Sequence, residues 1–156
     1  MEILITNECP KINVDIGEIE LQIGKILTTL DCNDHEISIL FIGDQGIRDL
    51  NHQFRGIDRP TDVLSFPQIS DDEPEPPGAP VLGDVDISLE TARQQSEDHG
   101  LSLKEELTLL LIHGILHLLG YDHEISAQEE ERMRKKTREL FEVIYPGKKL
   151  ADTCNF

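Results

Sequence analysis

Residues 102–123 read SLKEELTLLLIHGILHLLGYDH and predict a buried helix. Ser102 and Glu105 have the Ser-x-x-Glu spacing of a capping box, in which each side chain satisfies a backbone N–H at the helix start. The apolar run that follows predicts a helix that continues to Leu119, because Gly120 is typical of a helix end. The segment is interrupted by histidines and is too short to cross a bilayer, which needs about 20 apolar residues.

Three of the six histidines of the chain lie in this segment. His113 and His117 stand four residues apart, so both imidazoles lie on one face of the helix. Beyond Gly120 the chain can turn back and bring His123 to the same place. Three imidazoles leave one position of a zinc ion open to water, as in catalytic zinc sites. A single histidine on an apolar helix is usually a core residue, but this cluster favours a metal site.

The spacing H-x-x-x-H-x-x-G-x-x-H equals that of the metzincin zinc proteases. In those enzymes the residue after the first ligand is Glu, the general base that activates water, whereas here it is Gly114. The peptidase hypothesis therefore lacks its base. Three imidazoles also accept nickel, copper or iron, so the spacing does not identify the ion.

The remaining pattern predicts one domain over residues 1–156 with an α+β fold. We expect a single mixed β-sheet of about four strands packed with about five helices, because strands and helices do not strictly alternate. The expected strands lie around Ile3 and Ile5 and at 36–42, 61–66 (an edge strand) and 81–88. The other expected helices cover about 15–30, Asp44 (as N-cap) to about Phe54, 89–99, and Ser126 to about Tyr145. Residues 71–80, rich in Asp, Glu and Pro, predict a surface loop.

The composition excludes some classes of protein. A net charge of −17 over 156 residues argues against a protein that coats nucleic acid or anionic membrane through bulk electrostatics. The N-terminus has no basic and apolar segments of a signal peptide, so we expect no export. Cys9, Cys32 and Cys154 are far apart and odd in number, which predicts unpaired thiols in a reducing cytoplasm.

Three segments of the chain resemble the YbeY family of bacterial rRNA maturation factors. They are HGILHLLGYDH at 113–123, NHQFRGIDRPTDVLSFP at 51–67 and LGDVDI at 82–87. The order of elements around them is compatible with the family, so the resemblance covers nearly the whole chain. It implies a zincin-like metal helix within the α+β fold.

The resemblance implies a zinc-dependent endoribonuclease that cleaves single-stranded RNA. Its roles would be rRNA processing and maturation, including the 3′ end of 16S rRNA, and ribosome quality control. The implied cofactor is one Zn2+ per chain, held by His113, His117 and His123, and Arg55 is the residue associated with activity. A cation and a guanidinium suit phosphodiester cleavage, since both stabilise negative charge on phosphate oxygens. The implied partners are rRNA precursors and the ribosome or its proteins, with neither DNA nor membrane, in the cytoplasm.

Several residues keep two interpretations. Arg55 is either an active-site cation or a surface ion-pair partner of Asp58 or Asp62. Asp122 either orients a ligand imidazole or caps a turn. Asp84 and Asp86 alternate along a strand and share a face, as an edge or loop anchor or, less favourably, as metal ligands. A basic cluster on the last helix either faces RNA or pairs with neighbouring glutamates: Arg132, Arg134, Lys135, Lys136 and Arg138.

The leading hypothesis is therefore a metal-dependent endoribonuclease. A second hypothesis is a ribosome assembly factor with weak or no catalysis, in which the metal stabilises the fold. The absence of Glu after His113 motivates that alternative.

Overall fold

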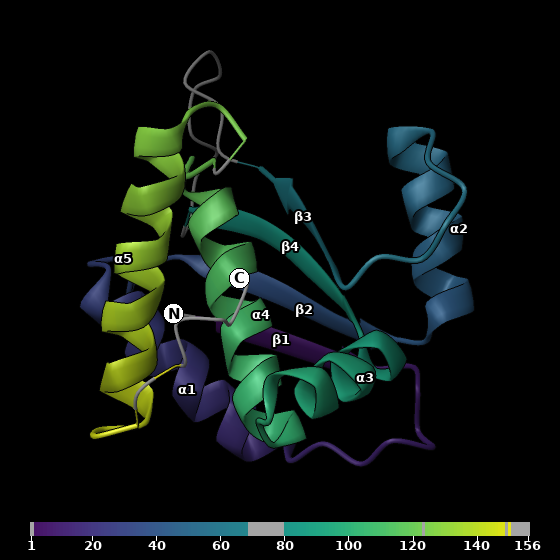
Figure 1. The fold of residues 1–156 in the computed structure, drawn as a ribbon, viewed down its shortest axis with the longest axis horizontal. Helices are drawn as coiled ribbons and strands as arrows, with labels where there is room; N and C mark the ends of the chain where they lie inside the picture. The colour runs from purple at the N-terminus through teal and green to yellow at the C-terminus, as the bar shows by residue number, and fades with distance from the viewer. Residues whose placement is uncertain (1, 69–79, 123, 149, 151–156) are drawn as a thin grey trace.

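A four-stranded mixed sheet forms the centre of the molecule (Figure 1). The computed structural model describes residues 2–68, 80–122, 124–148 and 150. The strand order is β1-β2-β4-β3, in which the first three strands are parallel and β3 is an antiparallel edge strand. The strands are β1 (Glu2–Asn7), β2 (Glu36–Ile42), β3 (Val63–Pro67) and β4 (Val81–Ser88). The predicted α+β class, mixed sheet and edge position of β3 are thus confirmed.

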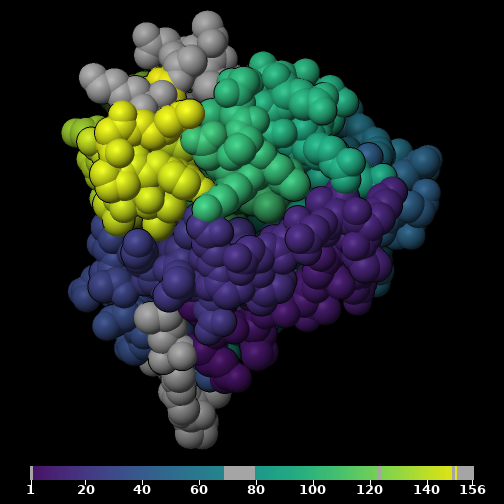
Figure 2. All heavy atoms as spheres, turned by 90° about the horizontal axis from the view of Figure 1, so that it is seen from below, coloured from purple at the N-terminus to yellow at the C-terminus, as the bar shows by residue number. Residues whose placement is uncertain are grey.

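Five helices in the described residues surround this sheet. Four gather on one face, where α4 is central and α1, α3 and α5 pack around it (Figure 1). Seen from below, the atoms of α5 lie against those of α1 and α4 (Figure 2). Helix α2 instead packs on the opposite face. The helices are α1 (Ile16–Thr29), α2 (Asp44–Arg55), α3 (Leu89–His99), α4 (Leu103–Leu118) and α5 (Ala127–Ile144).

The two faces of the sheet differ in composition because side chains alternate along each strand. Ile37, Ile39 and Val85 point toward the four helices and are buried in the main core. On the other face, Ile42 and Leu64 form a small second core with Ile47 of α2. The sheet is thus closed by helices on one side and only partly covered on the other.

Most helix ends follow the local signals in the sequence. The predicted capping box at Ser102 and Glu105 is present, and Gly100 ends α3 in a left-handed conformation with φ of 68°. At the start of α5, Ser126 accepts a hydrogen bond from the Glu129 amide, while the Glu129 carboxylate pairs with Arg132.

Two boundaries differ from the sequence expectation. Gly43, not Asp44, is the N-cap of α2, because the Asp44 carboxylate accepts hydrogen bonds from Ser88 and Thr91 at the start of α3. Strand β3 starts at Val63 rather than at residue 61, since the chain bends at Asp62, whose side chain accepts a hydrogen bond from the Val63 amide.

The thiols of Cys9 and Cys32 are free and buried, as expected. Burial raises the pKa of the Cys32 thiol. Cys154 and His123, with all but the last residue of the expected 71–80 loop, lie outside the described residues. Within the described ranges, none of the helices has the length and apolar character needed to cross a membrane.

Candidate active site

The two histidines of α4 face each other. The Nε2 atoms of His113 and His117 are 3.0 Å apart, and the ring centroids are 4.6 Å apart. Two nitrogens bound to one tetrahedral zinc ion at about 2.0–2.1 Å lie about 3.3 Å from each other. The pair therefore fits a single divalent ion without a change in helix geometry.

The third predicted ligand, His123, lies outside the described residues. Among the residues that the structure does describe, no group of three potential ligands converges on one point. Asp122 lines the same cavity as the two imidazoles, and its Oδ1 accepts a hydrogen bond from the Glu124 amide at 2.9 Å. That contact is the turn interaction expected of an Asp beyond a helix end.

Gly114 lies where α4 meets the sheet. A Cβ atom at this position would lie 2.6 Å from Cγ1 of Val85 and 3.1 Å from its Cγ2, in the middle of β4. The Gly114 carbonyl also accepts a hydrogen bond from the Ser65 hydroxyl of β3, at 3.2 Å. Residue 114 thus points at the sheet, so a glutamate there has no room. The absence of the protease base has a packing reason.

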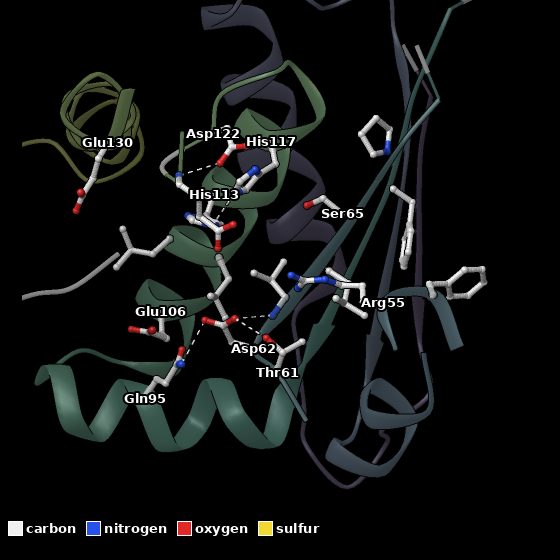
Figure 3. A pocket seen from close by; sticks show the side chains of 18 of the residues that line it. Arg55, Thr61, Asp62, Ser65, Gln95, Glu106, His113, His117, Asp122 and Glu130 are labelled. Atoms are coloured by element: carbon white, nitrogen blue, oxygen red, sulfur yellow. Dashed lines mark hydrogen bonds between the residues drawn. The ribbon is translucent and has the colours of Figure 1, made fainter. Parts of the chain in front are cut away.

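Residues of α4 and β3 line a cavity of about 830 Å3, and the histidine pair lies on its wall. Figure 3 shows His113, His117 and Asp122 at one end of this cavity, and Asp62, Gln95 and Glu106 at the other. We call this cavity the cleft. Its size accommodates a ligand much larger than a metal ion.

Arg55 reaches the cleft from the opposite wall. It is the last residue of α2, and Figure 3 shows its side chain directed into the cavity. The alternative ion-pair partners are occupied elsewhere. Asp58 pairs with Arg48 at 2.9 Å, and Asp62 accepts hydrogen bonds from the Val63 amide and the Gln95 side chain. The fold therefore places Arg55 in the cleft with the imidazoles.

A pair formed by a buried glutamate and a histidine lies at the far end of the cleft, and the sequence analysis did not predict it. Glu106 of α4 is 2% exposed, and its Oε2 lies 2.9 Å from Nδ1 of His99. Burial raises the pKa of Glu106, the contact with His99 opposes that shift, and Asp62 adds to it. The signal was available, because Glu106 precedes His113 by seven residues, two helical turns on the same face.

Asp84 and Asp86 lie outside the cleft. They share a face of β4, as predicted, but β4 lies between β2 and β3 rather than at an edge of the sheet. The edge interpretation is thus wrong, because the antiparallel β3 covers the side of β4 that the chain order left open. The loop-anchor alternative agrees with the hydrogen bond that Asp84 accepts from Gln68, just beyond β3.

Three residues of the basic cluster on α5 pair with carboxylates of their own helix. Arg132 contacts Glu129 at 3.2 Å and lies 4.3 Å above the ring of Tyr121. Two further pairs join Arg134 to Glu130 and Lys136 to Glu139. These contacts favour the charged-face interpretation over an RNA-binding surface.

Comparison with known proteins places the chain among nucleases. A family model described as Endoribonuclease YbeY matches residues 4–145. The Endoribonuclease YbeY of Syntrophus aciditrophicus is 39% identical over 146 residues, covering 93% of this chain and 91% of the relative. The Endoribonuclease YbeY of Persephonella marina is 46% identical over 142 residues, covering 91% of this chain and 92% of the relative. The solution structure of TM1509 from Thermotoga maritima superimposes with a TM-score of 0.64 at 27% identity, covering 95% of this chain and 99% of that one.

The α+β fold and these matches define the class of protein as a hydrolase that acts on RNA, an endoribonuclease. The match extends through the sheet and all five helices of the described chain. The chain belongs to the endoribonuclease YbeY family.

Proposed function

We propose that this endoribonuclease is metal-dependent and cleaves single-stranded RNA in the cleft. In this proposal His113, His117 and His123 hold one Zn2+ ion. The observation that carries it is the 3.0 Å separation of the two Nε2 atoms inside a cavity that Arg55 also enters. A bound divalent ion would supply Lewis-acid polarisation of a phosphate oxygen.

The residues of this chain divide the remaining work. The Arg55 guanidinium donates hydrogen bonds to non-bridging phosphate oxygens, where negative charge accumulates during cleavage. Packing of Gly114 against Val85 and the hydrogen bond from Ser65 fix the turn of α4 that bears the two imidazoles. The proposed metal site thus lies on a helix that is packed closely against the sheet, as precise positioning requires.

We further propose that residues 1–156 act as one metalloendoribonuclease domain in the cytoplasm. The main core runs continuously from Cys9 to Leu150, and the free thiols of Cys9 and Cys32 suit a reducing compartment. The proposed substrates are rRNA precursors, including the 3′ end of 16S rRNA, with a further role in ribosome quality control. Because a net charge of −17 disfavours binding to RNA alone, the ribosome or its proteins are the proposed source of specificity.

The metal site is tested by metal analysis combined with chelation and add-back. The purified protein should contain about one zinc ion per chain, lose cleavage of single-stranded RNA on chelation, and regain it with added zinc. His117→Ala should lose both metal and activity, because two ligands bind zinc far more weakly than three. The control is His35→Ala, because the His35 ring is hydrogen-bonded to Asp34 and does not line the cleft. Intact RNA with zinc-loaded protein, or unchanged metal content in His117→Ala, would contradict the proposal.

The substitution Arg55→Ala distinguishes the endoribonuclease hypothesis from the assembly-factor hypothesis. We expect cleavage to fall about 100-fold while metal content is kept, since removal of one charge-stabilising donor has effects of this size. Arg48→Ala is the matched control, because Arg48 lies on the same helix and pairs with Asp58 outside the cleft. Full restoration of rRNA processing in cells by Arg55→Ala would favour the assembly-factor hypothesis over catalysis.

A further inference from the structure

An exposed aromatic ring stands on the wall of the cleft. Phe54 precedes Arg55 at the end of α2 and is 58% exposed. In the described part of the chain, the other exposed large apolar side chains do not line the cleft: Leu4, Ile16, Leu21, Ile125 and Val143. The exposed ring at this place offers apolar area that a ligand in the cleft can cover.

A second aromatic ring fixes the orientation of the first. The ring centroids of Phe54 and Phe66 are 5.2 Å apart with an interplanar angle of 63°, an edge-to-face contact. Phe66 belongs to β3, so the sheet supports a ring that the end of a helix alone would leave mobile. Both rings line the cleft and a neighbouring hollow of about 550 Å3 on the partly covered sheet face. The pair thus forms a preorganised ridge at the margin of the cleft.

The position beside Arg55 suits one nucleotide. Consecutive residues of a helix project about 100° apart, so the ring and the guanidinium leave α2 in different directions. Both nevertheless line the cleft. A phosphate bound by Arg55 would therefore place the base of an adjoining nucleotide within reach of the Phe54 ring.

The charge of the protein favours a contact that does not depend on a positive field. At a net charge of −17, phosphates gain little from the overall field of the molecule. Stacking of a base on an aromatic ring needs no positive charge and tolerates any sequence, and proteins that bind single strands use it widely. Unpaired bases are available for stacking in single-stranded RNA but not in a duplex.

We propose that Phe54, supported by Phe66, is a stacking platform for an unpaired nucleobase of the RNA substrate. This inference rests on the proposed function and adds a binding subsite to it. The ring selects single strands by stacking, while Arg55 contacts the backbone.

Binding of short, cleavage-resistant single-stranded oligo(A) and oligo(U) to the intact protein tests the platform without turnover. Phe54→Leu should weaken the binding of oligo(A) about 5- to 150-fold, the range measured when a stacking ring is removed. Phe54→Tyr should bind as the wild type does, because it keeps the ring. The preference for oligo(A), whose bases stack more strongly, should vanish in Phe54→Leu. Leu21→Ala, an exposed apolar change on α1 outside the cleft, is the control.

The salt dependence of binding gives an independent readout. The slope of log affinity against log salt should stay unchanged in Phe54→Leu, whereas Arg55→Ala should reduce it by about 0.7, the loss of one phosphate contact. Wild-type affinity in Phe54→Leu, a retained preference for oligo(A), or no measurable binding by the wild type would overturn the proposal. Metal-dependent RNA cleavage that does not change in Phe54→Leu would support the proposed function and contradict the stacking platform. Binding that depends on the Phe54 ring, without any RNA cleavage, would support the stacking platform and contradict the proposed function.

Discussion

The carboxyl group of Asp86 lies on the partly covered face of the sheet, where it is 7% exposed. Burial raises its pKa to about 6, and the nearby carboxylates of Asp84 and Glu8 add to the shift. In the unfolded chain the same group titrates near 3.8. The folded protein therefore holds a proton on Asp86 in a pH range where the unfolded chain has already released it.

Asp86→Asn should stabilise the protein at neutral pH. The stabilising contribution of protonated Asp86 is fully present below pH 4 and is lost as the pH rises through 6, because the folded-state pKa is the higher one. A shift of about two pKa units corresponds to about 3 kcal/mol. Urea unfolding should show Asp86→Asn more stable than the wild type by up to this amount at pH 8, and nearly equal at pH 4. A difference independent of pH would contradict the assignment. Asp84→Asn should give a smaller gain of the same sign.

The sequence predicts contacts between side chains of the same helix. It does not predict contacts between side chains of two different elements. The pairing of His113 with His117 follows from helical periodicity alone. The ion pair suggested between Arg55 and Asp58 does not form, because the turn after α2 brings Asp58 to Arg48. The importance of Phe54 depends on Phe66, which enters from a strand that the local pattern cannot place.

The packing of α4 on β4 sets an element-scale prediction. Gly114→Ala should destabilise the protein by about 1–2 kcal/mol, because the new Cβ collides with the stiff side chain of Val85 and outweighs the gain in helix propensity. The midpoint of urea unfolding measures the change. Combining it with Val85→Ala should remove the clash, so the two changes should not be additive.

Gly24 of α1 supplies the matched control. No atom lies within 4 Å of a Cβ built there, and the residue is inside a helix. Gly24→Ala should therefore stabilise the protein by up to about 1 kcal/mol. If both glycine substitutions changed stability in the same direction, the packing explanation for Gly114 would be wrong.

Element boundaries are predictable where the signal is local. The capping box of Ser102 and the left-handed Gly100 depend only on neighbours in sequence, and both bounds are as expected. Asp44 was expected to cap its own helix, but its carboxylate binds hydroxyls of Ser88 and Thr91, which are more than 40 residues away in the chain. Distant partners can outcompete a local cap.

Charge acts on the molecule as a whole. With a net charge of −17, the folded state repels itself more strongly than the expanded chain does. The Debye length falls from about 30 Å at 0.01 M salt to about 8 Å at 0.15 M, which screens this repulsion. Exposed ion pairs such as Lys11–Glu90 stabilise the folded state too little to offset the repulsion from the net charge.

Sodium chloride should therefore raise the melting temperature between 0.01 and 0.15 M. Each 1 kcal/mol of relief corresponds to about 2–4 °C for a chain of this size. Thermal unfolding followed by circular dichroism at constant pH measures the shift. Choline chloride should act equally, because screening does not depend on the cation. A fall in melting temperature would show that ion pairs outweigh the net charge.

The mixed sheet was predictable from the order of elements, but the strand order was not. β3 pairs with β4 in antiparallel register, and β2 pairs with β4 across the whole of α2 and β3. Nothing in the strand sequences specifies these partners, because each of the strands could pair at either edge. The cleft depends on this order, since β3 forms its wall opposite α4.

The unequal burial of α4 and α2 has a consequence for motion. Eleven of the 16 residues of α4 are buried, against two of 12 in α2. Local unfolding starts where few apolar contacts hold an element, so we expect the amide protons of α2 to exchange with solvent before those of α4. The wall of the cleft that carries the histidines is thus more stable against local unfolding than the wall where α2 ends in Phe54 and Arg55. Hydrogen exchange should therefore find the two imidazoles on the more protected side of the cleft.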